Sequence, residues 1–250
     1  MTENAFETIP GDGRLLFLCD HASNRLPEGG LGLDPGLLGT HIAYDIGAAA
    51  VTRALAKAYG APAFLGGWSR LLIDLNRGAD DPTIVMKLSD GSIIPGNVLG
   101  NRDAEAADAA RRINTFHAPY HAAIAAALDR MGPDAVVISM HSFTPAWKGH
   151  PRPWEVGVLY DRDTRLAVPL MARLQEAGFA VGDNEPYSGA LEGDTLNQHG
   201  TLRGLPHVLI EIRQDLIASD DAAQAFAVHL QPILDAALSD MRGTDMHRQG

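Results

Sequence analysis

Short apolar runs alternate with amphipathic segments along this chain. The apolar runs have the length of strands, and the amphipathic segments repeat their apolar positions at the spacing of a helix face. Strands are expected at residues 14–19, 61–65, 69–77, 135–140, 155–160, 179–182 and 207–212. Helices are expected at residues 45–58, 103–131, 163–177 and 219–240, the second divided near Pro119, whose nitrogen cannot donate inside a helix.

This alternation favours a single three-layer α/β/α sandwich with a mostly parallel central sheet. One domain is expected over residues 1–250, with poorly ordered tails at 1–12 and 242–250. In sheets of this kind, ligands bind outside the carboxyl ends of the strands. Residues 183–206 are polar and rich in glycine, without a strong period, and a segment of this length is expected to be a lid or a flexible loop.

Composition narrows the class of protein. The chain has 250 residues, and its 20 basic and 31 acidic side chains give a formal net charge of −11. A protein that binds nucleic acid or an anionic membrane through its overall field carries the opposite sign, so neither is an expected partner. The single cysteine, Cys19, leaves no internal disulfide to form, and no segment resembles a signal peptide or a membrane span. A cytoplasmic protein is therefore expected.

Polar side chains gather where three of the predicted strands end. His21 follows the first strand, Asn76 and Arg77 end the third, and His141 follows the fourth. Two imidazoles at separate strand ends are candidate metal ligands, and a hydrolytic zinc site commonly adds a carboxylate and leaves one position for water. Asp45, at the start of a predicted helix, is the carboxylate that the pattern favours.

Each of these residues also has an ordinary structural explanation. A histidine after a strand is commonly a hydrogen-bonded turn residue, and an aspartate at the start of a helix interacts favourably with the helix dipole. Asp20 adjoins His21 and would point elsewhere if the strand geometry persisted. Only the joint placement of His21, Asp45 and His141 favours a metal site.

Two further features indicate chemistry. Glu211 interrupts an apolar strand, where burial raises the pKa of a carboxyl group and suits it to act as a general base near neutral pH. An ion pair with Arg213, two residues on and on the same strand face, is the structural alternative. Arg70 and Arg77 bracket Asp74, and guanidinium groups can hold a carboxylate or stabilise an oxyanion, or form a local salt bridge.

The remaining signals are weaker. His117, Tyr120 and His121 fall in a helical stretch and are expected to be half exposed. His199 and Arg203, in the long polar segment, either reach the site or are solvated. No G-x-S-x-G and no H-E-x-x-H motif is present.

Five ordered blocks of this sequence resemble the N-formylglutamate amidohydrolase family in its broad sense. The resemblance extends from about residue 14 to residue 217. The blocks are Asp20–Pro27 (DHASNRLP), Tyr44–Gly47 (YDIG), Ser69–Arg77 (SRLLIDLNR), Ser139–Phe143 (SMHSF) and Ile210–Leu216 (IEIRQDL). Each block alone is weak, whereas five blocks in the same order are specific.

The resemblance implies a fold like that of the zinc carboxypeptidases and aspartoacylases, with metal-dependent amide hydrolysis. It implies that His21 and His141 hold the metal and that Glu211 is the general base. Residues 74–77 look like the carboxylate clamp of the aspartoacylase-like enzymes, and Arg70 matches their oxyanion-stabilising arginine. The expected substrate-binding residues are Asn76, Arg77, Arg213 and His199.

The sequence departs from the family pattern in two places. The wider carboxypeptidase pattern has a glutamate three residues after its first histidine, where this chain has Asn24, so Asp45 is favoured over Asn24 as the third ligand. The best-known formylglutamate enzymes read Pro-His-Ser-Gly around that histidine, where this chain has Asp-His-Ala-Ser. The fold and the chemistry therefore transfer more safely than the substrate.

The resulting hypothesis is a metal-dependent amidohydrolase that cleaves the N-acyl, and specifically the N-formyl, amide of an acidic or other amino acid. Zinc is the expected cofactor, with cobalt and manganese as alternatives, and a small anionic molecule is the expected partner. A non-catalytic metal-binding sensor domain and a carboxypeptidase-like or other acyl-amino-acid amidase are the competing hypotheses. A metal analysis combined with a panel of acylated amino acids separates the three.

Overall fold

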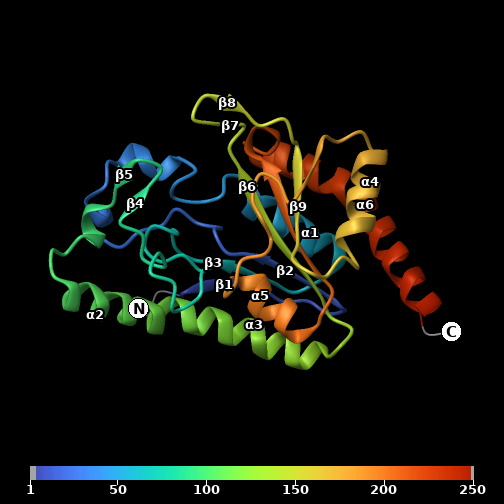
Figure 1. The fold of residues 1–250 in the computed structure, drawn as a ribbon, viewed down its shortest axis with the longest axis horizontal. Helices are drawn as coiled ribbons and strands as arrows, with labels where there is room; N and C mark the ends of the chain where they lie inside the picture. The colour runs from blue at the N-terminus through green and yellow to red at the C-terminus, as the bar shows by residue number, and fades with distance from the viewer. Residues whose placement is uncertain (1–3, 249–250) are drawn as a thin grey trace.

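A seven-stranded sheet forms the centre of the molecule (Figure 1). The computed structural model describes residues 4–248, with side chains up to residue 243. The strands lie in the order β1 (Phe6–Ile9), β3 (Ala63–Gly66), β2 (Leu15–Cys19), β6 (Val136–Phe143), β11 (His207–Arg213), β9 (Val156–Leu159) and β10 (Val181–Asp183). All neighbours are parallel except β1 with β3 and β11 with β9. The mostly parallel sheet predicted from the sequence is confirmed.

Helices cover both faces of this sheet. One face packs against α1 (Ala48–Tyr59), α4 (Ala167–Glu176) and α6 (Asp220–Arg248), and the other against α3 (Ala118–Met131) and α5 (Thr195–His199). The three-layer α/β/α class is therefore confirmed. None of the helices that the structure describes combines the length and the apolar character needed to cross a bilayer.

The strands at the centre of the sheet are apolar on both faces because both faces are covered. In β2, Leu16 and Leu18 pack toward α3, whereas Leu15, Phe17 and Cys19 pack toward α1 and α6. Successive side chains of a strand point to opposite faces. The same alternation continues into the polar residues at the strand ends, and it decides which of them meet.

The segment at residues 69–77 is not the predicted strand. Its apolar residues are buried, but its backbone forms turns whose carbonyl groups are satisfied by side chains. The Asn97 Nδ2 donates to Leu71 O at 2.8 Å, and the Arg112 Nη1 donates to Leu72 O at 2.7 Å. Because these donors replace a neighbouring strand, a β-compatible sequence folds here without joining a sheet.

The helical stretch at residues 103–131 divides as predicted. It consists of α2 (Arg102–Arg112), a π-helical turn (Ile113–His117) and α3, which has Pro119 in its first turn. Two short hairpins, β4 (Leu88–Ser89) with β5 (Ser92–Ile93) and β7 (Ala146–Trp147) with β8 (His150–Pro151), lie outside the main sheet.

Both expected tails contain regular structure. Strand β1 lies within residues 1–12, and α6 continues through residues 242–248. Residues 1–3 and 249–250 of the expected tails lie outside the described residues.

Candidate active site

His21, Asp45 and His141 meet at the carboxyl end of the sheet. One ligand atom from each lies within 4.8 Å of the others, and all three side chains are buried. The Asp45 Oδ2 lies 2.7 Å from the His141 Nδ1 and 3.4 Å from the His21 Nδ1. Asn24, the alternative third ligand, is exposed and donates its amide to Leu38 O instead.

Local structure explains this meeting. The Asp45 N–H donates to His21 O at 3.0 Å, which closes the long connection after β2 back onto that strand. Gly47 lets α1 begin directly behind Asp45: its φ is 79°, and a Cβ there would lie 2.1 Å from Ile217 O. His141 lies inside β6 rather than after it, because β6 extends to Phe143.

A second carboxylate holds the other ring nitrogen of each histidine. The His21 Nε2 lies 2.7 Å from Asp74 Oδ1, and the His141 Nε2 lies 3.2 Å from Asp20 Oδ2. Metal-binding histidines typically donate their remaining N–H to an outer carboxylate, which orients the ring. The donor set therefore fits a divalent cation: each Nε2 is occupied, and each Nδ1 is turned toward Asp45.

The charged groups around His21, Asp45 and His141 favour an ionised Asp45 carboxylate and protonated imidazole rings. Burial alone would raise the pKa of Asp45, but the charge on His21 and hydrogen bonds from His141 and His21 hold it far below its usual value. Burial alone would lower the pKa of His141, but hydrogen bonds to Asp20 and Asp45 raise it well above its usual value. The site thus stabilises positive charge between its carboxylates, which a bound metal would also supply.

Glu211 stands beside this group on the neighbouring strand. It pairs with His141 in the parallel register of β11 and β6, so both side chains lie on the α3 face of the sheet. Its exposed fraction is 6%, and its Oε2 has no hydrogen-bond partner among the described residues. Burial raises its pKa to about 7, and the nearby charge of Asp45 adds to the rise although His141 opposes it. A carboxyl group with this pKa can accept and return a proton near neutral pH.

Arg70 is held over the same site by two of its carboxylates. Its Nη2 donates to Asp74 Oδ2 at 2.9 Å, and its Nη1 lies 3.7 Å from Asp45 Oδ1. The salt bridge between Arg70 and Asp74 that the sequence allowed is present. It does not remove Arg70 from the site, because the guanidinium still lines the cavity.

Asn76 and Arg77 line the cavity next to Arg70. The Asn76 Oδ1 accepts a hydrogen bond from the Thr195 N–H at 3.1 Å, and its Nδ2 has no partner among residues 4–243. Among the side chains that the structure describes, the Arg77 guanidinium has only loose ion pairs, 4.0 Å from Asp74 and 4.0 Å from Asp81. Both side chains therefore offer hydrogen-bond donors to a ligand.

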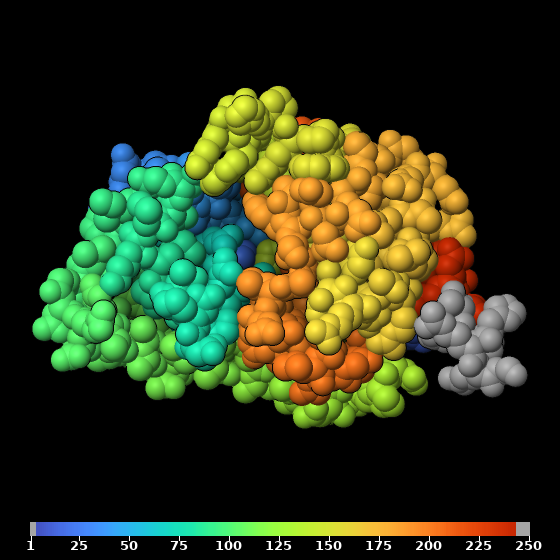
Figure 2. Space-filling view, viewed as in Figure 1, coloured from blue at the N-terminus to red at the C-terminus, as the bar shows by residue number. Residues whose placement is uncertain are grey.

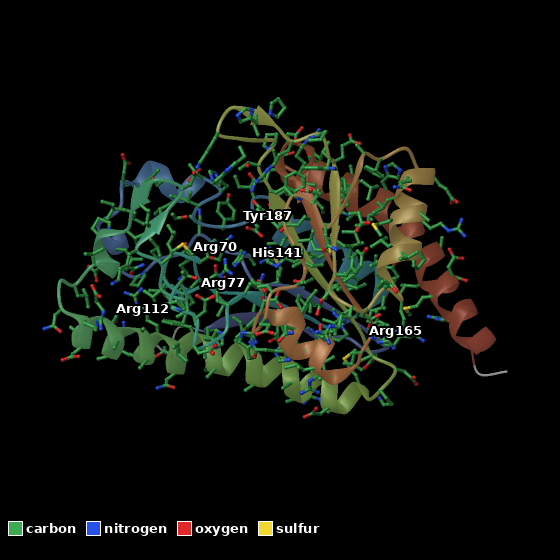
Figure 3. All side chains as sticks on the ribbon, in the orientation of Figure 1. Arg70, Arg77, Arg112, His141, Arg165 and Tyr187 are labelled. Atoms are coloured by element: carbon green, nitrogen blue, oxygen red, sulfur yellow. The ribbon has the colours of Figure 1, made fainter. Side chains whose placement is uncertain are left out.

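The cavity has a volume of about 260 Å³ and opens on one face of the molecule. Figure 2 shows a hollow on this face, between a teal segment around residue 80 and an orange segment around residue 190. In Figure 3, Arg70, Arg77, His141 and Tyr187 gather at the centre, whereas Arg112 and Arg165 lie apart from them. Sites for drug-sized ligands measure roughly 300–1,000 Å³, so this cavity suits a molecule of the size of an acylated amino acid.

Two of the predicted substrate-binding residues are not brought to this cavity. Arg213 points to Asp215, with its Nε 2.7 Å from Asp215 Oδ1, and it forms no ion pair with Glu211. His199 lies behind the cavity wall, against His121. The segment between β10 and α5 is anchored rather than free, since the Asn184 Oδ1 accepts from the N–H groups of Tyr160 and Gly189.

The sequence-based expectation for His117, Tyr120 and His121 was wrong, because all three are buried. The reason is that the turn segment at residues 69–77 packs over this face of α3. Tyr120 donates its hydroxyl to Asp20 Oδ1 at 2.9 Å. Asp20 and Asp74, the outer carboxylates, were not predicted to support the histidines either. In the sequence, the only indications were that Asp20 directly precedes His21 and that Asp74 lies two residues before Asn76.

The buried histidines His117, His121 and His199 form a second group, whose hydrogen bonds have defined directions. His117 Nε2 lies 2.8 Å from Arg77 O, and His121 Nε2 lies 2.9 Å from Leu75 O. Because a carbonyl oxygen only accepts, each Nε2 carries the proton. The His121 Nδ1 therefore accepts from the His199 Nε2, at 2.9 Å. His121 and His117 thereby fix the carbonyl groups of Leu75 and Arg77, the residues on either side of Asn76.

Comparisons with known proteins identify the family to which this chain is similar. The family model of N-formylglutamate amidohydrolase matches residues 13–218. A solved structure of a gene product from Agrobacterium tumefaciens is 34% identical, with 96% of this chain and 97% of that chain covered and a TM-score of 0.89. An N-formylglutamate amidohydrolase from Ralstonia eutropha is 22% identical, with 98% and 99% covered and a TM-score of 0.65, and it shares the fold. No similar protein was found among the curated proteins. The matched region includes every residue of the site described above, and the chain belongs to the N-formylglutamate amidohydrolase family.

Proposed function

We propose that this protein is a metal-dependent amidohydrolase that releases formate from an N-formyl amino acid. The observation that carries the proposal is the meeting of His21, Asp45 and His141 beside the buried carboxyl group of Glu211, at the floor of a small cavity. Membership of the N-formylglutamate amidohydrolase family supports the reaction class.

His21, Asp45 and His141 would hold the metal, and their nitrogen and carboxylate donors suit zinc, with cobalt and manganese also compatible. A bound divalent metal lowers the pKa of water and polarises a carbonyl oxygen. Asp74 and Asp20 keep the two imidazoles oriented through their Nε2 atoms.

Glu211 moves the proton in this proposal. It accepts a proton from the attacking water as the new C–O bond forms at the formyl carbon. It then gives that proton to the nitrogen as the C–N bond breaks, so the products are formate and a free amino acid. A pKa of about 7 suits a group that must both accept and donate near neutral pH.

Arg70 and Arg77 each interact with a different negative charge of the substrate. Arg70, fixed by Asp74 and close to Asp45, stabilises the charge that develops on the formyl oxygen. Arg77 and the Nδ2 of Asn76 bind the carboxylate of the amino acid and orient the amide.

The test is hydrolysis of formyl-, acetyl- and peptidyl-amino acids by the zinc-, cobalt- or manganese-loaded protein. Formyl substrates should be cleaved, and Glu211→Gln should reduce kcat by at least about a hundredfold while retaining the metal. Glu192→Gln, the same substitution at an exposed residue outside the cavity, is the matched control. Binding without turnover in every metal would instead identify a sensor domain. Faster cleavage of acetyl or peptidyl substrates would identify one of the other amidases.

A further inference from the structure

The side chains that line the cavity are of two chemical kinds. The wall formed by residues 69–77 carries Arg70, Asn76 and Arg77. Three leucines from three different elements also line the cavity: Leu159, Leu196 and Leu209. Their exposed fractions are only 3%, 6% and 5%, so they lie deep in the cavity rather than at its rim.

The fold places these leucines beside the reacting groups. Leu209 lies two residues before Glu211 on β11, on the same face, and it pairs with Leu159 in the antiparallel register of β9. Leu196 directly follows Thr195, whose N–H donates to Asn76 Oδ1. Leu196 is thus next to the Asn76 end of the cavity and Leu209 is next to Glu211, so an amino acid whose carboxylate is held at Asn76 and Arg77 and whose amide lies at Glu211 has these leucines beside it.

One charged group also lies on this side, and it is negative. Asp194 lines the cavity with an exposed fraction of 4%, and its Oδ1 caps α5 by accepting from the Asn197 N–H at 2.7 Å. No ion pair among the side chains of residues 4–243 involves it. Burial raises its pKa to about 6, and the negative charge of Asp20 adds to the rise, so it is ionised in a weakly alkaline assay.

We infer that the site prefers N-formyl amino acids with an apolar side chain over those with an acidic one. This inference rests on the proposed function and names its substrate class. A second carboxylate, as in N-formylglutamate, would be placed against the three leucines and Asp194. Arg213 is bound to Asp215 and His199 is bound to His121, so neither lines the cavity to receive it. His41 does line the cavity, but its Nε2 is paired with Asp90 at 3.2 Å.

Ligand affinity tests this preference without depending on turnover. Zinc-loaded Glu211→Gln protein is titrated calorimetrically at pH 8 with N-formyl-L-leucine, N-formyl-L-methionine and N-formyl-L-glutamate. Burial of an apolar side chain predicts at least about tenfold tighter binding of the first two. Equal or tighter binding of N-formyl-L-glutamate would overturn the inference. The same ratio should appear in kcat/KM of the unsubstituted protein.

The charge of Asp194 gives a second, sharper test. Asp194→Asn keeps the helix cap, because asparagine caps as well as aspartate, and it should bring the affinity for N-formyl-L-glutamate closer to that for N-formyl-L-leucine by about three- to tenfold. Glu192→Gln removes a charge nearby but outside the cavity and should leave the ratio unchanged. An unchanged ratio in Asp194→Asn would also overturn the inference. Tight binding of the formyl amino acids with no hydrolysis by the unsubstituted protein would contradict the proposed function alone.

Discussion

The molecule contains two groups of buried histidines that behave in opposite ways. His21 and His141 lie between carboxylates, which raise the pKa of both rings against the effect of burial and, for His21, of Arg70. His121 and His199 lie against carbonyl groups and other imidazoles, and burial lowers their pKa to about 3 and about 4. All four side chains are at most 7% exposed.

Burial alone therefore does not decide what a histidine does in this protein. A carboxylate partner stabilises positive charge on the ring or on a metal beside it, whereas a carbonyl partner only fixes the position of the ring proton. The first group is suited to hold a cation. The second group is suited to hold the backbone of the turn segment that carries Asn76 and Arg77.

The largest expected difference is in metal binding. His141→Ala should lose stoichiometric zinc and reduce kcat/KM by at least about a thousandfold, because it removes one of three protein donors. His199→Ala, in the second group, should retain one zinc per chain. Zinc content after gel filtration measures both. Zinc retained in His141→Ala and lost in His199→Ala would reverse the assignment of the two groups.

The outer carboxylates should have the next largest effect. Asp74→Asn should weaken zinc binding by about 10- to 100-fold, the usual cost of losing an outer partner of a metal-binding histidine. Competition with a chelator measures this affinity. Asp80→Asn, at an exposed position in the same loop, is the control. An unchanged affinity in Asp74→Asn would mean that Asp74 does not orient His21.

His121 should act on substrate affinity. His121→Phe removes the donor to Leu75 O and should raise KM for N-formyl amino acids by about 5- to 20-fold, roughly the energy of one buried hydrogen bond, with a smaller change in kcat and normal zinc content. His121→Gln keeps an N–H that can reach the carbonyl and should recover part of the loss. KM for an uncharged formamide separates the roles: a purely structural defect would affect both substrates equally.

The second group should also make stability depend on pH. The pKa of His121 is about 3 in the folded protein and 6.5 ordinarily, so the unfolded chain binds the proton first as the pH falls. The contribution of neutral His121 to the free energy of unfolding is nearly complete above pH 6.5. It declines at lower pH, by about 2 kcal/mol between pH 7 and pH 5. Urea unfolding should show a shallower decline over this range for His121→Phe than for the unsubstituted protein. Parallel pH profiles would show that His121 is not neutral and buried.

The fold was largely predictable because its strands are buried on both sides. The apolar runs of β2, β6 and β11 need no knowledge of their neighbours to be recognised. Residues 69–77 look equally apolar, but their backbone partners are Asn97 and Arg112, which are distant in the sequence. No local pattern distinguishes a strand from a buried turn that is satisfied by remote side chains.

The site was predictable where it depends on strand positions. The side chains of His141 and Glu211 lie side by side on one face of the sheet, because each follows the alternation of its strand. Arg213 follows the same alternation, yet the neighbouring Asp215 competes for its guanidinium. The role of Asp20 could not be predicted, because it depends on the parallel pairing of β2 with β6 and on the packing of α3, which bring Asp20 to His141 and Tyr120.

The central claim is that His21, Asp45 and His141 hold one divalent cation beside Glu211. The most direct measurement is an anomalous difference map from crystals of the zinc-loaded protein, collected at the zinc absorption edge. A single strong peak is expected about 2.0–2.2 Å from both Nδ1 atoms and an Asp45 oxygen. A peak at the buried histidines of α3 and α5, or bonded to neither His21 nor His141, would contradict it.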